Sequence, residues 1–216
     1  MTKEIAMPTI NEWATAEHAL AYLSRADAIP HRTEGEAVLL EFVPRDVKRI
    51  LDLGTGDGRL LALLKIERAP AQALALDFSP TMLQAARERF ASDPTITVIE
   101  HNMDTPLPDL GRFDAIVSSF AIHHCTHDRK RALYQEIFAA LRPGGVFCNL
   151  EHVDSPSPAM HAQFLHSMGW SPENEDPSNK LLDMETQLGW LRDLGFADVD
   201  CYWKWRELAL LIGFRP

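Results

Sequence analysis

The chain has 216 residues, 46% of them hydrophobic and 24% charged, which are the proportions of a globular protein with a substantial core. Its formal net charge of −10 disfavours a protein that binds nucleic acid through an overall basic surface. No apolar run is long enough to span a membrane, and the first residues lack the apolar core of a signal peptide. The widely spaced Cys125, Cys148 and Cys201 suit a reduced, cytoplasmic protein better than a disulfide framework.

The first predicted elements are two amphipathic helices, over residues 12–26 and 34–42, within an N-terminal helical cap over residues 1–43. From residue 47 onwards, short apolar runs alternate with amphipathic segments, which is the pattern of βα units around a parallel sheet. The runs are almost wholly apolar, as expected when helices cover both faces of the sheet. Strands are predicted over residues 47–53, 71–77, 95–100, 113–120 and 146–152, and helices over residues 59–66, 79–90 and 129–141.

Residues 153–182 interrupt this alternation. They contain four prolines with acidic and histidine residues between them, and a helix is predicted over residues 160–168. An irregular segment of this length after a strand is typical of a lid or substrate loop, so we predict an insertion that covers a ligand site. A helix over residues 184–194 and two strand-like runs, 199–203 and 207–212, complete a chain that we expect to form a single domain over residues 1–216.

The most specific local pattern is the segment ILDLGTGDGR, residues 50–59. An apolar strand ends near an acid, and three glycines at alternate positions lead into a helix, so a ligand can approach bare backbone. A dinucleotide fingerprint reads G-x-G-x-x-G, but here the third glycine comes one residue early. The pattern G-x-G-x-G, with Asp52 two residues before it, resembles motif I of the class I S-adenosylmethionine (SAM) methyltransferases.

The resemblance covers residues 47 to 216, because the two strand-like runs at the end also match that family. It implies an α/β, Rossmann-like fold with a seven-stranded, mostly parallel sheet, the last strand antiparallel, and helices on both faces. It also implies S-adenosyl-L-methionine as the cofactor and S-adenosyl-L-homocysteine (SAH) as its product.

Several polar side chains follow the predicted strands. Asp77 ends the second strand and can accept hydrogen bonds from both hydroxyls of a ribose, although an acid there can also cap the next helix. Asp104 matches the family position that contacts adenine, although residues 102–104 also suit a simple Asx turn. The resemblance assigns the cofactor to Asp52, Gly54, Thr55, Gly56, Gly58, Asp77, Phe78, Met82, Asn102, Met103, Asp104, Ser119 and Phe120.

Histidines gather after the fourth strand, where ligands of open α/β sheets bind. An acceptor must lose a proton to attack a methyl group, and histidine titrates in the required range. We therefore take His124 and then His123 as candidate catalytic bases, although each can equally be structural. Candidates for binding the acceptor are His31, Arg32, His152 and Trp170.

Arg32 can clamp a carboxylate of a ligand, or it can pair with Glu34 or Glu36. The histidines and Cys125 have the composition of a zinc site. However, adjacent histidines on one strand or turn point in opposite directions, and no second ligand cluster with firm spacing follows, so no metal is predicted.

The predicted function is SAM-dependent transfer of a methyl group to an O or N atom of a small-molecule acceptor by in-line displacement. The segment after the fourth strand lacks the N/D-P-P-Y/F motif of the family's DNA and protein amino-methyltransferases. The expected partner is a small-molecule methyl acceptor, neither nucleic acid nor membrane, with a homodimer as the oligomeric state to test. The alternatives are a non-catalytic SAM-binding regulatory module, a SAM-fold enzyme with a reaction other than methylation, and an NAD-dependent oxidoreductase, which the early third glycine disfavours.

Overall fold

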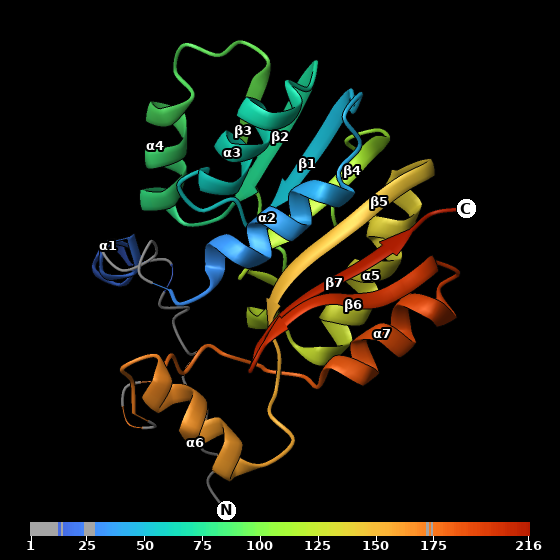
Figure 1. Ribbon diagram of the computed structural model, residues 1–216. Helices are drawn as coiled ribbons and strands as arrows, with labels where there is room; N and C mark the ends of the chain where they lie inside the picture. Colours follow the sequence, from blue (N-terminus) through green and yellow to red (C-terminus); the bar gives the residue numbers. More distant parts are fainter. Residues whose placement is uncertain (1–12, 14, 24–28, 172, 174) are drawn as a thin grey trace, which may run out of the picture.

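The computed structural model describes residues 13, 15–23, 29–171, 173 and 175–216, and it is built around one seven-stranded sheet (Figure 1). The strand order is β3-β2-β1-β4-β5-β7-β6, and β7 runs antiparallel to both of its neighbours. The predicted Rossmann-like sheet with an antiparallel last strand is thus confirmed. The strands are β1 (Arg49–Leu53), β2 (Gln72–Asp77), β3 (Ile96–Glu100), β4 (Phe113–Ser119), β5 (Leu141–His152), β6 (Ala197–Trp205) and β7 (Leu208–Phe214).

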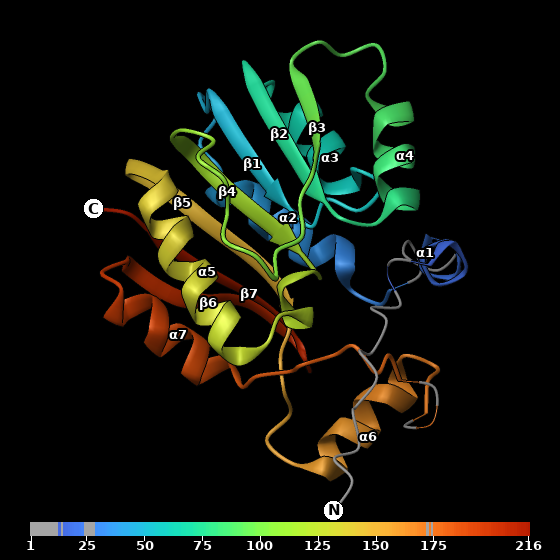
Figure 2. The same cartoon turned by 180° about the vertical axis from the view of Figure 1, so that it is seen from behind.

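Helices cover both faces of the sheet, with α2 and α3 on one face and α5 and α7 on the other (Figures 1 and 2). Side chains alternate along a strand, so neighbouring residues enter different cores. Ile50 packs in the cluster under α2 and α3, and Leu51 packs in the cluster under α5 and α7. The described helices are α1 (Ala16–Leu23), α2 (Arg32–Phe42), α3 (Arg59–Arg68), α4 (Pro80–Arg89), η3 (Ile122–His124, a 3-10 helix), α5 (His127–Ala140), α6 (Pro158–Ser167) and α7 (Met184–Asp193).

The helices α1 and α6 lie beyond the carboxyl ends of the parallel strands, apart from the two layers that cover the sheet (Figure 1). Of the first predicted amphipathic helix, residues 16–23 are helical, and residues 12, 14 and 24–26 lie outside the described residues. The helix α6 begins two residues earlier than predicted, because the Ser157 side chain accepts a hydrogen bond from the Met160 amide and Pro158 suits the first turn. None of the described helices is both long enough and apolar enough to cross a membrane.

The fifth strand begins five residues before its predicted start. Leu141 pairs with Phe113, and a register shift between Phe113 and Ala115 accommodates the residues before Val146. The preceding helix α5 ends at Ala140, one residue before its predicted end, and the Pro143-Gly144-Gly145 run lies in this irregular strand start, where Gly144 has φ +79°. The proline and the two glycines indicate a turn before the strand, but pairing with β4 extends the strand across these residues.

Candidate functional site

A cleft lies at the carboxyl ends of β1, β2 and β4, where Leu53, Asp77 and Ser119 end their strands. Its volume is about 910 Å³ with the open solvent at its mouth included. The structure brings together there all of the predicted cofactor residues except Gly58. The residues of that set that line the cleft are Asp52, Gly54, Thr55, Gly56, Asp77, Phe78, Met82, Asn102, Met103, Asp104, Ser119 and Phe120.

The glycine turn after β1 uses its three glycines in different ways. Gly54 has φ +66°, and a Cβ there would lie 2.2 Å from the Ala121 Cβ, so no side chain fits. A Cβ at Gly56 would meet nothing nearer than the Met82 Sδ at 3.9 Å, so the turn leaves backbone bare beside the cleft. The structure places Gly58 outside the cleft lining: a Cβ there would lie 2.4 Å from the Phe90 ring, so Gly58 allows α3 to pack closely against Phe90, the residue that follows α4.

The Asp77 carboxylate joins the glycine turn to the start of α4. Its Oδ2 accepts a hydrogen bond from the Gly56 amide at 2.8 Å, and its Oδ1 accepts from the amides of Phe78 and Ser79 at 2.8 and 2.9 Å. Burial raises the pKa of Asp77, and these three amides oppose the shift. The carboxylate therefore has a fixed orientation at the cleft wall, in agreement with a ligand role and with helix capping alike.

Asp52 is buried beside it and accepts a hydrogen bond from the Thr55 hydroxyl at 2.6 Å. Burial raises the pKa of Asp52 to about 7, the Thr55 hydrogen bond opposes that shift, and the nearby Asp77 and Asp57 raise it further. Asp57 and Asp77 thus lie close enough to Asp52 in the cleft to raise its pKa, and a cation bound there would favour the charged forms of all three.

Arg32 lies on this cleft rather than in the neighbouring cavity described below. Its Nε donates to Glu36 at 2.9 Å and its Nη1 to the Tyr22 hydroxyl at 3.2 Å, while Nη2 lies 3.5 Å from the Ser119 Oγ. The predicted pairing with Glu36 is present, and Glu34 is bonded to His31 instead. Because Arg32 is buried and borders the cleft, its guanidinium can also reach a carboxylate bound there.

The segment after β3 contributes a residue that sequence reasoning missed. Asn102 accepts a hydrogen bond from the Asp104 amide at 2.9 Å, so the Asx turn is present, and both residues also line the cleft. His101 lines the cleft beside them, and its Nε2 is buried with no hydrogen-bond partner among the described residues. A single histidine at the end of a strand offered no pattern by which to find it.

A second cavity of about 690 Å³, open solvent included, adjoins the cleft and shares Trp13, Tyr22, Phe120 and His124 with it. Its walls are mainly aromatic and aliphatic, and they come largely from the residues before β1 and from those between β5 and α7. Two of the predicted acceptor-binding residues, His152 and Trp170, lie on it, and so do both candidate bases, His123 and His124. The full lining is Trp13, Tyr22, Ile29, Phe120, His123, His124, His152, Phe164, Met168, Trp170, Asp176, Asn179 and Leu208.

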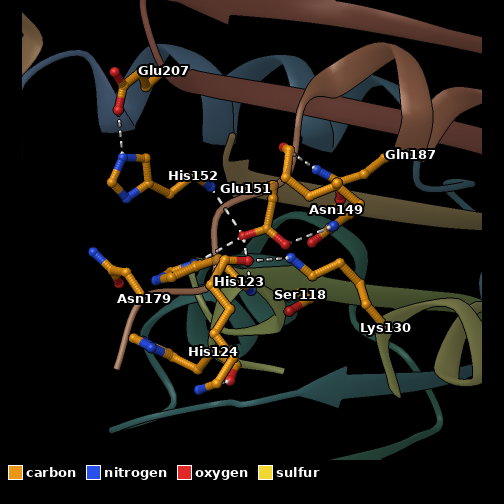
Figure 3. A network of polar contacts seen from close by, with 12 residues as sticks. Ser118, His123, His124, Lys130, Asn149, Glu151, His152, Asn179, Gln187 and Glu207 are labelled. Atoms are coloured by element: carbon orange, nitrogen blue, oxygen red, sulfur yellow. Dashed lines mark hydrogen bonds and ion pairs between the residues drawn. The ribbon is translucent and has the colours of Figure 1, made fainter. Parts of the chain in front are cut away.

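His123 and His152 each have a buried carboxylate behind them (Figure 3). The His123 Nδ1 lies 2.8 Å from the Glu151 Oε1, and the His152 Nε2 lies 2.9 Å from the Glu207 Oε2. Burial lowers the pKa of His123, and Glu151 opposes that shift. Both rings are therefore held in fixed orientations at the wall of the second cavity.

His124 lies at the junction of the two cavities, with its Nδ1 2.8 Å from the Ser178 Oγ. Burial lowers the pKa of His124 well below its usual value, and the adjacent His123 adds to the shift, so its ring is neutral near pH 7. The backbone amide of Lys180 donates to the His123 carbonyl at 2.9 Å, which ties the later segment to this turn.

The structure does not bring His31 to either of these two cavities formed by the described residues. His31 precedes α2 with φ +60°, its ring centroid lies 4.5 Å from that of Trp205, and its Nδ1 lies 2.8 Å from the Glu34 Oε1. Packing against β6, which no local pattern near His31 could indicate, turns this residue away from the site.

Glu151 and Glu207 were also missed, although Glu151 is an acid near the end of the apolar strand β5 and Glu207 directly precedes the apolar strand β7. Such a position indicates a buried carboxylate, but the sequence does not show its partner. His123 lies 28 residues from Glu151, and His152 lies 55 residues from Glu207. Within the part of the chain that the structure describes, no group of three or more histidine, cysteine or acidic side chains could hold a metal ion.

The sheet order, the antiparallel β7 and a glycine-turn cleft with an acid at the end of β2 define a Rossmann-like methyltransferase. Comparison with known proteins agrees: a family model described as a methyltransferase domain matches residues 50–145. The chain is 32% identical to the ubiquinone/menaquinone biosynthesis C-methyltransferase UbiE of Dinoroseobacter shibae, over 83% of this chain and 76% of that protein. It therefore belongs to the class I SAM-dependent methyltransferases, whose methyl donor is S-adenosyl-L-methionine.

Two further proteins are similar to this chain over about two thirds or less of their own length. An uncharacterized methyltransferase of Mycobacterium tuberculosis is 32% identical over 62% of this chain, and the match spans 64% of that protein. The solved structure of an O-methyltransferase family protein from Burkholderia thailandensis has a TM-score of 0.74 at 21% identity, covering 94% of this chain and 61% of that one. The names of these proteins include carbon and oxygen methylation, so the acceptor has to be argued from the site.

Proposed function

We propose that this chain binds SAM in the cleft and methylates a hydroxyl oxygen of a small, flat acceptor held in the second cavity. The observation that carries the proposal is the junction of the two cavities at Phe120 and His124. Bound SAM supplies an electrophilic methyl group on a sulfonium sulfur. A methyl donor in one cavity and an acceptor in the other would meet at this junction, where orientation alone contributes much of the rate.

The cleft suits the chemistry of SAM at each of its parts. The acidic cluster of Asp52, Asp57 and Asp77 would be offset by an ammonium and a sulfonium, and Asp77 can accept from ribose hydroxyls. The Arg32 guanidinium would hold the carboxylate of the methionine part. Around the adenine, Phe78, Met82 and Asp104 follow the family pattern, and the unpartnered His101 Nε2 adds a polar contact.

The second cavity favours a hydroxyl acceptor over a cationic amine. The described carboxylates at this cavity already have partners. Glu151 is paired with His123, Glu207 is paired with His152, and the Asp176 carboxylate lies 3.3 Å from the His18 ring. Aromatic walls such as Phe164 and Trp170 suit a flat molecule. Imidazoles therefore face the acceptor, and the O–H group of an uncharged hydroxyl compound can donate to a neutral imidazole nitrogen.

Within this proposal His123 is the catalytic base. Its Nδ1–H donates to Glu151, so its Nε2 is free to accept the hydroxyl proton as the oxygen takes the methyl group. Glu151 would stabilise the imidazolium that forms, as a buried carboxylate does in a catalytic dyad. His124 is the weaker base, because its lowered pKa favours the neutral ring.

The segments over residues 1–43 and 153–182 are proposed to cover the reacting atoms and to exclude water from them, within one domain over residues 1–216. In the described part, Trp13 lies 5.2 Å from the His124 ring and Tyr22 bonds to Arg32, so the cap touches both cavities. The loop after α6 contacts the same turn through Ser178.

A second candidate is methylation of a ring carbon, favoured by the identity to UbiE over 76% of that protein. The same base would serve, because loss of a hydroxyl proton makes neighbouring ring carbons nucleophilic. The product distinguishes the two: an oxygen-methylated product is an ether, whereas a carbon-methylated product retains the hydroxyl.

Calorimetry with SAM, SAH and NAD tests the cofactor, and release of SAH in the presence of phenols, amines and carboxylic acids tests the acceptor. We expect SAM and SAH to bind, NAD not to bind, and phenols to be the class that releases SAH. Asp77→Asn should weaken SAM binding about tenfold or more, with exposed Asp128→Asn as the control. Binding of NAD instead of SAM would refute the proposal, and tight SAM binding without turnover of any class would favour a regulatory module.

A further inference from the structure

The second cavity carries two histidine–carboxylate pairs, whereas removal of one hydroxyl proton requires only one. His123 with Glu151 and His152 with Glu207 are built alike, with nitrogen–oxygen distances of 2.8 and 2.9 Å. The ring centroids of His123 and His152 lie 5.6 Å apart, with the ring planes at 70°. Removal of one hydroxyl proton therefore leaves one of the two pairs without an assigned role.

Each pair leaves one ring nitrogen free for a ligand. Because the His123 Nδ1 and the His152 Nε2 face their carboxylates, the His123 Nε2 and the His152 Nδ1 are the free atoms. Figure 3 shows the two rings and the Asn179 side chain gathered on one side, away from Lys130 and Asn149. All three of these gathered residues line the second cavity.

Which nitrogen of each ring faces its carboxylate decides what the other nitrogen recognises. A ring nitrogen next to a buried carboxylate donates its proton to that carboxylate, so the free nitrogen of a neutral ring is an acceptor. Each free nitrogen therefore requires a donor from the ligand, and an O–H group supplies one. Since the two ring centroids lie 5.6 Å apart, a ligand with two donors close together suits both rings, as when the donors stand on neighbouring ring carbons.

We propose that His152, positioned by Glu207, is a second acceptor-binding residue, and that the cavity takes an aromatic acceptor with hydroxyl groups on two neighbouring ring carbons. This inference rests on the proposed function and names the substrate class of the same site. One hydroxyl loses its proton to His123 as its oxygen takes the methyl group, and the other donates a hydrogen bond to His152. The aromatic walls at Phe164 and Trp170 accommodate the ring that carries both hydroxyls.

The test is a set of binding titrations followed by protein NMR, with SAH present throughout so that no turnover occurs. The probes are catechol, which has neighbouring hydroxyls, its isomers resorcinol and hydroquinone, phenol with one hydroxyl, and guaiacol, in which one catechol hydroxyl is a methyl ether. The wild-type chain should bind catechol about tenfold more tightly than each of the other four, because only catechol satisfies both rings.

The variant His152→Asn should lose most of the preference for catechol while its affinity for phenol changes less than twofold. An asparagine amide can still donate to Glu207, and thermal unfolding checks that the variant folds. The matched control is His166→Asn, on the exposed side of α6. The guaiacol titration makes the equivalent change on the ligand and involves no risk to folding.

The outcomes separate this inference from the proposed function. If phenol binds as tightly as catechol, or if His152→Asn retains the preference, the second dyad does not select the acceptor and the inference is overturned, while methylation of a single hydroxyl stands. If SAH binds but no phenolic probe does, the aromatic acceptor of the proposed function is overturned, and this inference with it.

Discussion

The two adjoining cavities present opposite chemistry to their ligands. In the cleft, carboxylates line the wall directly, and burial raises the pKa of Asp52 to about 7 although the charge of Arg32 opposes the shift. In the second cavity, the carboxylates of Glu151 and Glu207 stand behind histidine rings, and the rings line the wall. The first arrangement favours a cation, and the second favours a neutral molecule with acidic protons.

The cavities also differ in how the chain builds them. The cleft depends on a glycine turn and on strand ends, so short runs of neighbouring residues form most of its lining, as where the Thr55 hydroxyl donates to Asp52. The second cavity joins segments far apart, as in the contact of His152 with Glu207. A change in the cleft should therefore act through backbone geometry, whereas a change in the second cavity should act through side-chain chemistry.

The largest expected effect comes from the glycine turn. Gly54→Ala should destabilise the fold by about 2–4 kcal/mol, since the residue has φ +66° and the new methyl would overlap Ala121. Gly56→Ala should cost only about 1 kcal/mol, because its surroundings are open, but it should weaken SAM binding. Denaturant unfolding and calorimetry measure the two effects.

Gly189→Ala is the matched control for this pair, because it lies within α7 with open space around it and alanine favours helix. We expect it to be neutral or slightly stabilising. Equal destabilisation by Gly54→Ala and Gly189→Ala would contradict the view that backbone geometry dominates the cleft.

The next largest effect concerns the carboxylate behind His123. Glu151→Gln should lower the turnover of an accepted substrate about 100-fold, since the imidazolium loses its stabilising partner. Glu151 also opposes the depression of the pKa of His123, so the variant should carry that pKa lower still and move the acid limb of the rate profile to lower pH. Rate measurements across pH, with Glu151→Asp as the conservative variant, test both expectations. A lower rate with an unmoved acid limb would mean that Glu151 only supports the fold.

A smaller effect should appear in the pH dependence of cofactor binding. In the free protein Asp52 is mostly protonated below pH 7, because its pKa is about 7, and a cationic ligand favours the carboxylate. SAM affinity should therefore fall about tenfold for each pH unit below 7. Asp52→Asn should remove this part of the dependence, whereas exposed Asp128→Asn should retain it. Identical profiles for the wild type and Asp52→Asn between pH 5.5 and 7.5 would exclude Asp52 as the titrating group.

The cleft could be anticipated from the sequence to a greater extent than the second cavity. Asp52, Gly54, Gly56 and Asp77 were predicted as cleft residues because their spacing along strand, turn and helix is a local pattern that dictates where they lie. Two strand-like runs after the last helix were also predicted, and the family resemblance that they supported implied the antiparallel ending of the sheet.

What the sequence could not indicate depends on partners distant in the chain. The early start of β5 needs the pairing of Leu141 with Phe113, and the location of His31 outside the cavities needs Trp205. The dyad of His123 with Glu151 likewise joins residues from two separate strand ends. A single sequence gives the residue types at such positions, but it does not show which of these residues are in contact.

The smallest expected effect lies where the second cavity meets its cover. On α6, the His161 Nδ1 lies 3.0 Å from Glu207 and its Nε2 lies 3.0 Å from Glu175, so this ring links the carboxylate behind His152 to the loop after α6. Burial lowers the pKa of His161, but the hydrogen bonds and charges of Glu175 and Glu207 outweigh it, so the net pKa is raised.

A raised folded-state pKa means that the protonated ring stabilises the fold fully below its unfolded pKa, and that this contribution is lost as pH rises through the folded value. Because the pair is partly exposed, His161→Gln should cost only about 0.5–1 kcal/mol near pH 5.5 and less at pH 8, as measured by thermal unfolding. His166→Gln, exposed on the same helix, should show no such difference between the two pH values. Faster hydrogen exchange of α6 in His161→Gln alone would identify this contact as the link that holds the cover to the second cavity, whereas equal exchange in both variants would mean that apolar packing of Phe164 and Leu165 holds it.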